Sequence, residues 1–180
     1  HRIGEPSPET GAPMHEVERN ALLIRHLAEG PVVNPRLYPA PKDYATAQTF
    51  ASGQPYVCIA PTSVWGTKQF PAHKWVELIQ RLPQDHKVFL LGGPGDHAAC
   101  AQIQTAAGHP LVENLAGRLS FLASAALMQG AVMNYVNDSA PLHFATAMDA
   151  PVTAIFCSTL PAFGFTPRST HSIVIETKIP

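Results

Sequence analysis

Charge is scarce in this chain of 180 residues, and neither sign dominates. Charged residues make up 14% of the sequence, with 12 Lys and Arg against 13 Asp and Glu, so the formal net charge is −1. Nucleic acids and anionic membranes attract proteins through excess positive charge, and we therefore expect no nucleic-acid partner. The hydrophobic fraction of 46% excludes a disordered chain and predicts a globular fold.

Cysteines and long apolar runs are also sparse. The three cysteines, Cys58, Cys100 and Cys157, are odd in number and far apart, which excludes a disulfide framework and predicts small buried side chains. His97 and Cys100 form an H-x-x-C pair, but no second pair completes a zinc site, so we expect no metal. No apolar run approaches the roughly 20 residues of a membrane-spanning helix, and the first residues lack a signal-peptide pattern.

The first residues form a proline-rich loop without a starting Met, and we expect the chain to be a piece of a longer protein. Apolar periodicity predicts a helix over 15–30 that stops at Gly30 and a short helix over 42–53, on either side of a proline-rich linker over 31–43. These segments divide the chain into a leading part, residues 1–54, and one domain, residues 55–180.

From residue 55 short apolar runs alternate with amphipathic segments. The runs predict strands over 56–61, 87–93, 111–117, 131–136 and 151–156, the last of these being the final strand. Helices are predicted between them, over 71–82, 96–108, 120–131 and 139–149. This alternation is typical of an α/β fold, a doubly wound parallel sheet with right-handed crossovers and helices on both faces. Such sheets bind ligands beyond the carboxyl ends of their strands.

Polar loops follow the predicted strands. TSVWGTK supplies the hydroxyls of Ser63 and Thr67 and the charge of Lys68 before a helix, which suits a phosphate, although an ordinary solvated loop fits equally. It is not a P-loop, because the Gly-to-Lys spacing is wrong. In GGPGD, Asp96 is suited to bond a ribose diol or, alternatively, to cap the next helix.

The loop NDSAPLH opens a predicted helix. Asp138 or Ser139 fits the N-cap position, and Pro141 fits the first turn. His143 lies about one turn later, where it would face the same crevice. A Ser-His-Asp triad is excluded, because Asp138 and Ser139 are sequence neighbours and no G-x-S-x-G elbow exists.

In combination, these motifs resemble the C-terminal half of glycosyltransferase family 9, the ADP-heptose:lipopolysaccharide heptosyltransferases. The resemblance covers nearly the whole chain and rests on PTSVWGTKQFPAHKW, LLGGPGD, ENLAGRLSFLASAAL, VNDSAPLHFATAMDAPVTAIF and CSTLPAFGFTP, in this order. HEVERN resembles the helix that ends the N-terminal half. The resemblance implies a GT-B architecture of two Rossmann-like domains, in which residues 1–54 are the end of the N-terminal domain and the linker, and residues 55–180 bind the nucleotide-sugar donor.

The resemblance also implies the role of each candidate site residue. The donor diphosphate would be held by Ser63, Thr67, Lys68 and the backbone N–H groups of Ser139 and Ala140, with His143 beside them. Lys68 would be catalytic, because its charge offsets the charge that builds on the leaving ADP. Asp96 would lie near the ribose, Leu119 near the adenine and Asp138 near the heptose hydroxyls. Ala140 replaces a family glycine, so a positive φ or a donor contact there would strain or crowd the site.

The function implied is inverting transfer of heptose from ADP-heptose to a lipopolysaccharide-core acceptor. The acceptor half and its aspartate base lie outside this chain, so the chain alone would be inactive. No cofactor is implied. The resemblance places the protein in the cytoplasm of a Gram-negative bacterium and is compatible with peripheral association at the inner membrane. Two alternatives remain: a nucleotide-sugar-binding module without transferase activity, and a GT-B-like sugar-nucleotide epimerase with acid-base carboxylates of its own.

Overall fold

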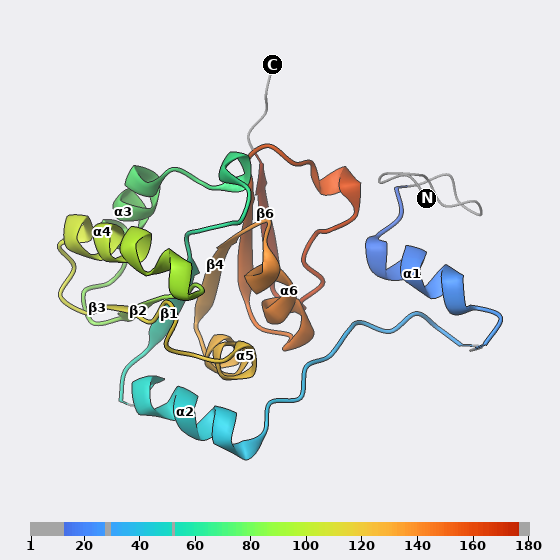
Figure 1. Ribbon diagram of the computed structural model, residues 1–180, viewed down its shortest axis with the longest axis horizontal. Coiled ribbons are helices and arrows are strands. Elements are labelled where there is room, and N and C mark those ends of the chain that lie inside the picture. The colour runs from blue at the N-terminus through green and yellow to red at the C-terminus, as the bar shows by residue number, and fades with distance from the viewer. Residues whose placement is uncertain (1–12, 28–29, 52, 177–180) are drawn as a thin grey trace.

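The computed structural model describes residues 13–27, 30–51 and 53–176. From residue 41 to residue 156 its α-helices and strands alternate along the chain, as Figure 1 shows. The helices are α1 (Glu16–Ile24), α2 (Pro41–Ala51), α3 (Ala72–Arg81), α4 (His97–Ala107), α5 (Phe121–Gln129) and α6 (Ala140–Ala147). The strands are β1 (Tyr56–Ala60), β2 (Lys87–Leu90), β3 (Val112–Asn114), β4 (Met133–Asn137), β5 (Val152–Phe156) and β6 (Ser172–Glu176). Three short 3-10 turns are η1 (Gly66–Lys68), η2 (Pro94–Asp96) and η3 (Pro161–Phe163).

The strands form one parallel sheet in the order β3-β2-β1-β4-β5-β6. Cys58 at the centre of β1 lies opposite Phe89 of β2 and Asn134 of β4. The prediction of a parallel sheet is therefore confirmed. The order of the strands reverses between β1 and β4, and such a switch point opens a crevice at the carboxyl ends of the two strands.

Helices cover both faces of the sheet, as the alternation predicts (Figure 1). Successive β1 side chains point to opposite faces. Cys58 and Ala60 are buried in a core that includes residues of α2, α5 and α6. Val57 and Ile59 are buried in a second core, with Trp75 of α3 and residues of α4. This two-sided burial makes the fold a doubly wound, Rossmann-like α/β domain.

Strand β6 contradicts the prediction that residues 151–156 form the final strand. It pairs in parallel with β5, with Val152 opposite Ser172 and Phe156 opposite Glu176. The connection between the two strands contains η3 and, among the described residues, no α-helix. Every residue of β6 is exposed, at the edge of the sheet. The prediction was wrong because it required a helix before each strand and a buried apolar run.

Segment 13–54 differs from its prediction in one respect. Helix α1 ends at Ile24 and does not extend to Gly30, and Leu23, Ile24 and Leu27 are more than half exposed. Because burial of an apolar face supplies most helix stability, the periodicity of these residues was not enough to extend the helix. The predicted helix over 42–53 is confirmed as α2, and its Ala47 is buried in the core under α5. The division at residue 54 stays a prediction.

The cysteines are buried or half-buried free thiols. Cys58 and Cys100 are almost completely buried, which agrees with their expected role as small hydrophobic side chains. Burial raises the pKa of all three thiols, that of Cys100 to about 12. They are therefore protonated and poorly nucleophilic at neutral pH. Within the described ranges, no helix combines the length and the apolar character needed to cross a membrane.

Gly117 holds the loop after β3 against the loop after β2. Its N–H donates to the carbonyl of Gly92 at 2.9 Å. Its φ is +79°, and a Cβ there would lie 2.8 Å from the Cα of Pro94. Left-handed backbone and close contact with another backbone segment both favour glycine.

We expect Gly117→Ala to destabilise the domain by about 2–4 kcal/mol, from left-handed strain and overpacking together. Gly108→Ala is the matched control, because Gly108 has a φ of +62° but open space at its Cβ position. The control should lose about 1–2 kcal/mol. Urea unfolding measures both variants, and equal losses would show that Pro94 yields without cost.

Candidate functional site

The switch point between β1 and β4 brings two predicted residues together. Lys68 ends η1, in the loop after β1, and Asp138 directly follows β4. The Nζ of Lys68 donates to Oδ2 of Asp138 at 2.7 Å. Because carboxyl ends of parallel strands meet at one edge of a sheet, residues 70 positions apart form one ion pair.

Asn137 fixes the loop that carries Lys68. Its side chain is fully buried at the end of β4. Its Nδ2 donates to the carbonyl of Pro61 at 2.9 Å, and its Oδ1 accepts from the N–H of Phe70 at 2.9 Å. These bonds join both ends of the 61–70 loop to β4. The sequence showed a polar residue at this strand end but not this structural role.

The carboxylate of Asp138 is buried, with 5% of the residue exposed. Its Oδ2 also accepts from the Oγ1 of Thr159 at 2.7 Å. Thr159 lies between β5 and η3, in the loop that follows the neighbouring strand. The loops after β1 and β5 therefore each place one donor at a single oxygen of Asp138, the residue that follows the strand between them, β4. Sequence reasoning missed Thr159, because a threonine in a loop gives no sign of such a contact.

A pocket of about 340 Å³ adjoins this cluster at the same edge of the sheet. It is lined by predicted residues that follow β1, β2, β3 and β4: Ser63, Asp96, Leu119, Ser139 and Ala140. An apolar wall completes it, formed by Leu91, Phe121, Met128 and Phe144 among others. The rings of Phe121 and Phe144 lie 5.6 Å apart between centroids. An apolar wall with a few polar groups at one end is typical of small-molecule sites.

The other predicted residues lie outside the pocket lining. Thr67 is exposed on η1. His143 is exposed on α6, and its ring packs against Phe165 at 6.3 Å between centroids. It lies near enough to Asp138 and Lys68 for both charges to act on its pKa. Although the residue as a whole is exposed, atoms packed around its ring partly desolvate it and lower the pKa of His143, against an opposing effect of the Asp138 carboxylate. His143 is therefore neutral at pH 7.

The side chains of Asp96 and Ser139 lie at turns beside the pocket, and only that of Asp96 caps a backbone N–H there. The Oδ2 of Asp96 accepts from the N–H of Gly93 at 2.7 Å, so one carboxylate oxygen caps its own turn. Ser139 occupies the N-cap position of α6, but its side chain caps no N–H of the described helix. In the first turn of α6, Pro141 has no N–H and the N–H of Leu142 donates to the carbonyl of Ser139 at 3.0 Å. The N–H of Ala140 is thus the group of this turn that is open to another acceptor.

Ala140 is not strained by its backbone. Asp149 is the one non-glycine residue with positive φ in the described part of the chain. The condition under which alanine would be strained, a positive φ at this position, is therefore not met.

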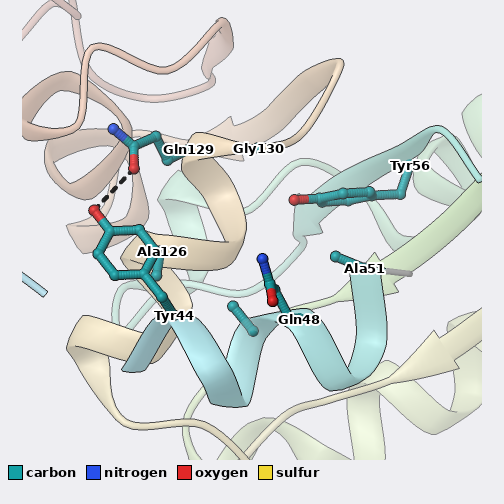
Figure 2. Close-up of a pocket in the computed structure, with 8 residues that line it drawn as sticks. Tyr44, Gln48, Ala51, Tyr56, Ala126, Gln129 and Gly130 are labelled. Atoms are coloured by element: carbon teal, nitrogen blue, oxygen red, sulfur yellow. Dashed lines mark hydrogen bonds between the residues drawn. The ribbon is translucent and has the colours of Figure 1, made fainter. Parts of the chain in front are cut away.

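A second pocket, of about 510 Å³, lies between α2 and α5 (Figure 2). The hydroxyl of Tyr44 donates to Oε1 of Gln129 at 3.0 Å across its mouth. Tyr56 lines it and donates to the carbonyl of Leu127 at 2.8 Å. Tyr56 begins β1, so this pocket lies at the opposite end of the strand from Lys68. None of the described residues that line it is charged, and none is a predicted site residue.

Comparison with known proteins identifies the family of the chain. The family model of glycosyltransferase family 9 (heptosyltransferase) matches residues 8–178. Lipopolysaccharide heptosyltransferase 3 of Escherichia coli is 34% identical over 110 residues, which cover 59% of this chain and 32% of that protein.

Two solved structures share the fold. The ADP-heptose lipopolysaccharide heptosyltransferase II of E. coli matches with a TM-score of 0.73 and 26% identity, over 82% of this chain and 47% of that one. The E. coli heptosyltransferase WaaC with ADP matches with a TM-score of 0.70 and 22% identity, over 98% of this chain and 52% of that one. The chain thus spans about a third of its first curated relative and about half of these solved chains.

Proposed function

The chain belongs to glycosyltransferase family 9, and we propose that it is the donor-binding half of an inverting heptosyltransferase that uses ADP-heptose. The observation that supports this most is the meeting of Lys68, Asp138 and the start of α6 beside one pocket at the β1/β4 switch point. The relative of 26% identity is itself described as an ADP-heptose enzyme.

The pocket suits each part of such a donor. Its apolar wall, with Leu119 and Phe144, fits a nucleobase, and Asp96 offers its second carboxylate oxygen to a ribose diol. Ser63 and the open first turn of α6 would bind the diphosphate, because a helix N-terminus carries partial positive charge and free N–H groups. The sugar would then extend toward Asp138.

In the proposed reaction, the acceptor hydroxyl displaces ADP with inversion at the anomeric carbon. Negative charge builds on the phosphate oxygen that leaves. The ammonium of Lys68 and the backbone N–H groups of Ser139 and Ala140 would stabilise this charge, as preorganised donors do in transition states. We propose that the whole protein also contains the base that takes the acceptor proton and the site for the lipopolysaccharide-core acceptor. Its proposed location is the cytoplasm, at the inner membrane.

The carboxylates of this half favour transfer over epimerisation. Asp96 is the one carboxylate among the described residues that line the pocket, and one of its oxygens caps a turn. Asp138 is engaged by Lys68 and Thr159. An epimerase of this architecture would need a free acid-base pair facing the sugar.

Titration calorimetry of the 180-residue chain with ADP, ADP-heptose and UDP-sugars tests the proposal. We expect weak binding of ADP and ADP-heptose, no binding of UDP-sugars and no transfer to a lipopolysaccharide-core acceptor. Heat released by a UDP-sugar together with no response to ADP would refute the heptosyl assignment.

A further inference from the structure

Three neighbouring strands contribute to one carboxylate at this site. Lys68 follows β1, Asp138 follows β4 and Thr159 follows β5, and these strands are adjacent in the sheet (Figure 1). Both the Lys68 ammonium and the Thr159 hydroxyl donate to Oδ2 of Asp138 at 2.7 Å. From this arrangement, and resting on the proposed function, we propose that Thr159 is a positioning residue that orients Asp138 for the sugar of the donor.

The two donors on Asp138 differ in what else they can bind. Lys68 is partly exposed, with 27% of its side chain accessible, and it lies in the loop that would meet the diphosphate. An ammonium group can turn from the carboxylate toward a phosphate, because it has three donors on a flexible stem. Thr159 has one hydroxyl hydrogen, and the structure directs it to Asp138.

Thr159 would therefore matter most when the donor is bound. If Lys68 shifts toward the diphosphate, Asp138 keeps the bond from Thr159 and so keeps its orientation. Its buried carboxylate then presents a fixed acceptor to the sugar hydroxyls, and charge-assisted bonds of this kind depend strongly on geometry. Without the Thr159 hydroxyl, the carboxylate would follow Lys68, and the sugar would lose its aligned partner.

This role differs from simple support of the loop after β5. A loop that lost its shape would weaken binding of ADP and ADP-heptose alike, because Asp138 directly precedes Ser139 and Ala140, which line the pocket and would bind the diphosphate. Loss of Asp138 orientation would instead weaken the part of the affinity that the sugar adds. The ratio of the two affinities separates these cases.

The test compares ADP and ADP-heptose binding by calorimetry in Thr159→Val, Thr159→Ser and Thr170→Val. Valine removes the hydroxyl and keeps the shape, whereas serine keeps the hydroxyl. Thr170 is the matched control, because its hydroxyl also donates to an aspartate, Asp149, at 3.1 Å and its residue is exposed. If the valine variant does not fold, Thr159→Ala, which also removes the hydroxyl, takes its place in the comparison of ADP and ADP-heptose binding.

We expect Thr159→Val to bind ADP-heptose about tenfold more weakly, which is about 1.4 kcal/mol, and to bind ADP as the unaltered chain does. Thr159→Ser should restore the affinity, and Thr170→Val should change neither. An equal loss for both ligands, or no loss for either, would overturn the role of Thr159. An unaltered chain that binds neither ligand would instead overturn the proposed function.

Discussion

Replacing Lys68 with alanine should weaken ADP binding by about 1.5–3 kcal/mol, the usual contribution of a hydrogen bond to a charged group. The loss has two sources. The diphosphate loses a positive charge, and the buried Asp138 loses the ammonium that balances it at 2.7 Å. An unbalanced carboxylate beside the pocket would then repel the phosphates.

Titration calorimetry at two salt concentrations measures this effect. Lys74→Ala is the control, because this substitution removes the same formal charge. Lys74 is an exposed lysine on α3 that pairs with Glu77. The control should bind ADP with unchanged affinity. If Lys68→Ala also binds ADP as the unaltered chain does, Lys68 is a surface lysine paired with an aspartate and the diphosphate lies elsewhere.

Replacing Asn137 with leucine should destabilise the domain by about 2–4 kcal/mol, because it leaves a buried carbonyl and a half-buried N–H without a partner. These groups are the N–H of Phe70 and the carbonyl of Pro61, each bonded to Asn137 at 2.9 Å. Such a loss is a large part of the stability of about 5–15 kcal/mol that a domain usually has. Donor binding should fall with it, since the same bonds hold the Lys68 loop.

Urea unfolding monitored by circular dichroism gives the change in stability. Asn34→Leu is the control, because Asn34 also joins two segments by bonding to the carbonyl of Arg168 but is exposed. Water can replace its bonds, so its loss should stay within about 0.5 kcal/mol. Similar values for the two variants would mean that the 61–70 loop does not depend on Asn137.

The sequence predicted most of the fold because each element from β1 to β5 carries its own signal. The five apolar runs between residues 55 and 156 and the helices between them reappear with shifted ends, and Ser120 caps α5 by accepting from the N–H of Ala123 at 3.0 Å. Strand β6 does carry a short β-branched run, Ile173–Ile175, but it follows a long connection with only a 3-10 turn among its described residues, so the alternation of strands and helices did not predict it.

The candidate site was partly predictable for a geometric reason. Any parallel sheet gathers the loops after its strands at one edge, so Ser63, Asp96, Leu119 and Ser139 could be expected to approach one another. Which side chains bond to which was not predictable. The sequence assigned Lys68 to the diphosphate and Asp138 to the sugar, whereas the structure pairs them with each other and adds Thr159.

The pairing of Lys68 with Asp138 bears on how quickly an anionic molecule finds the pocket. The two opposite charges form a dipole whose field falls off quickly with distance, and the formal charge of the chain as a whole is −1. Electrostatic steering requires a net field that reaches beyond the Debye length of about 8–10 Å. Capture by this domain is consequently governed by random diffusion and short-range contact, and its encounter rate should change little with ionic strength.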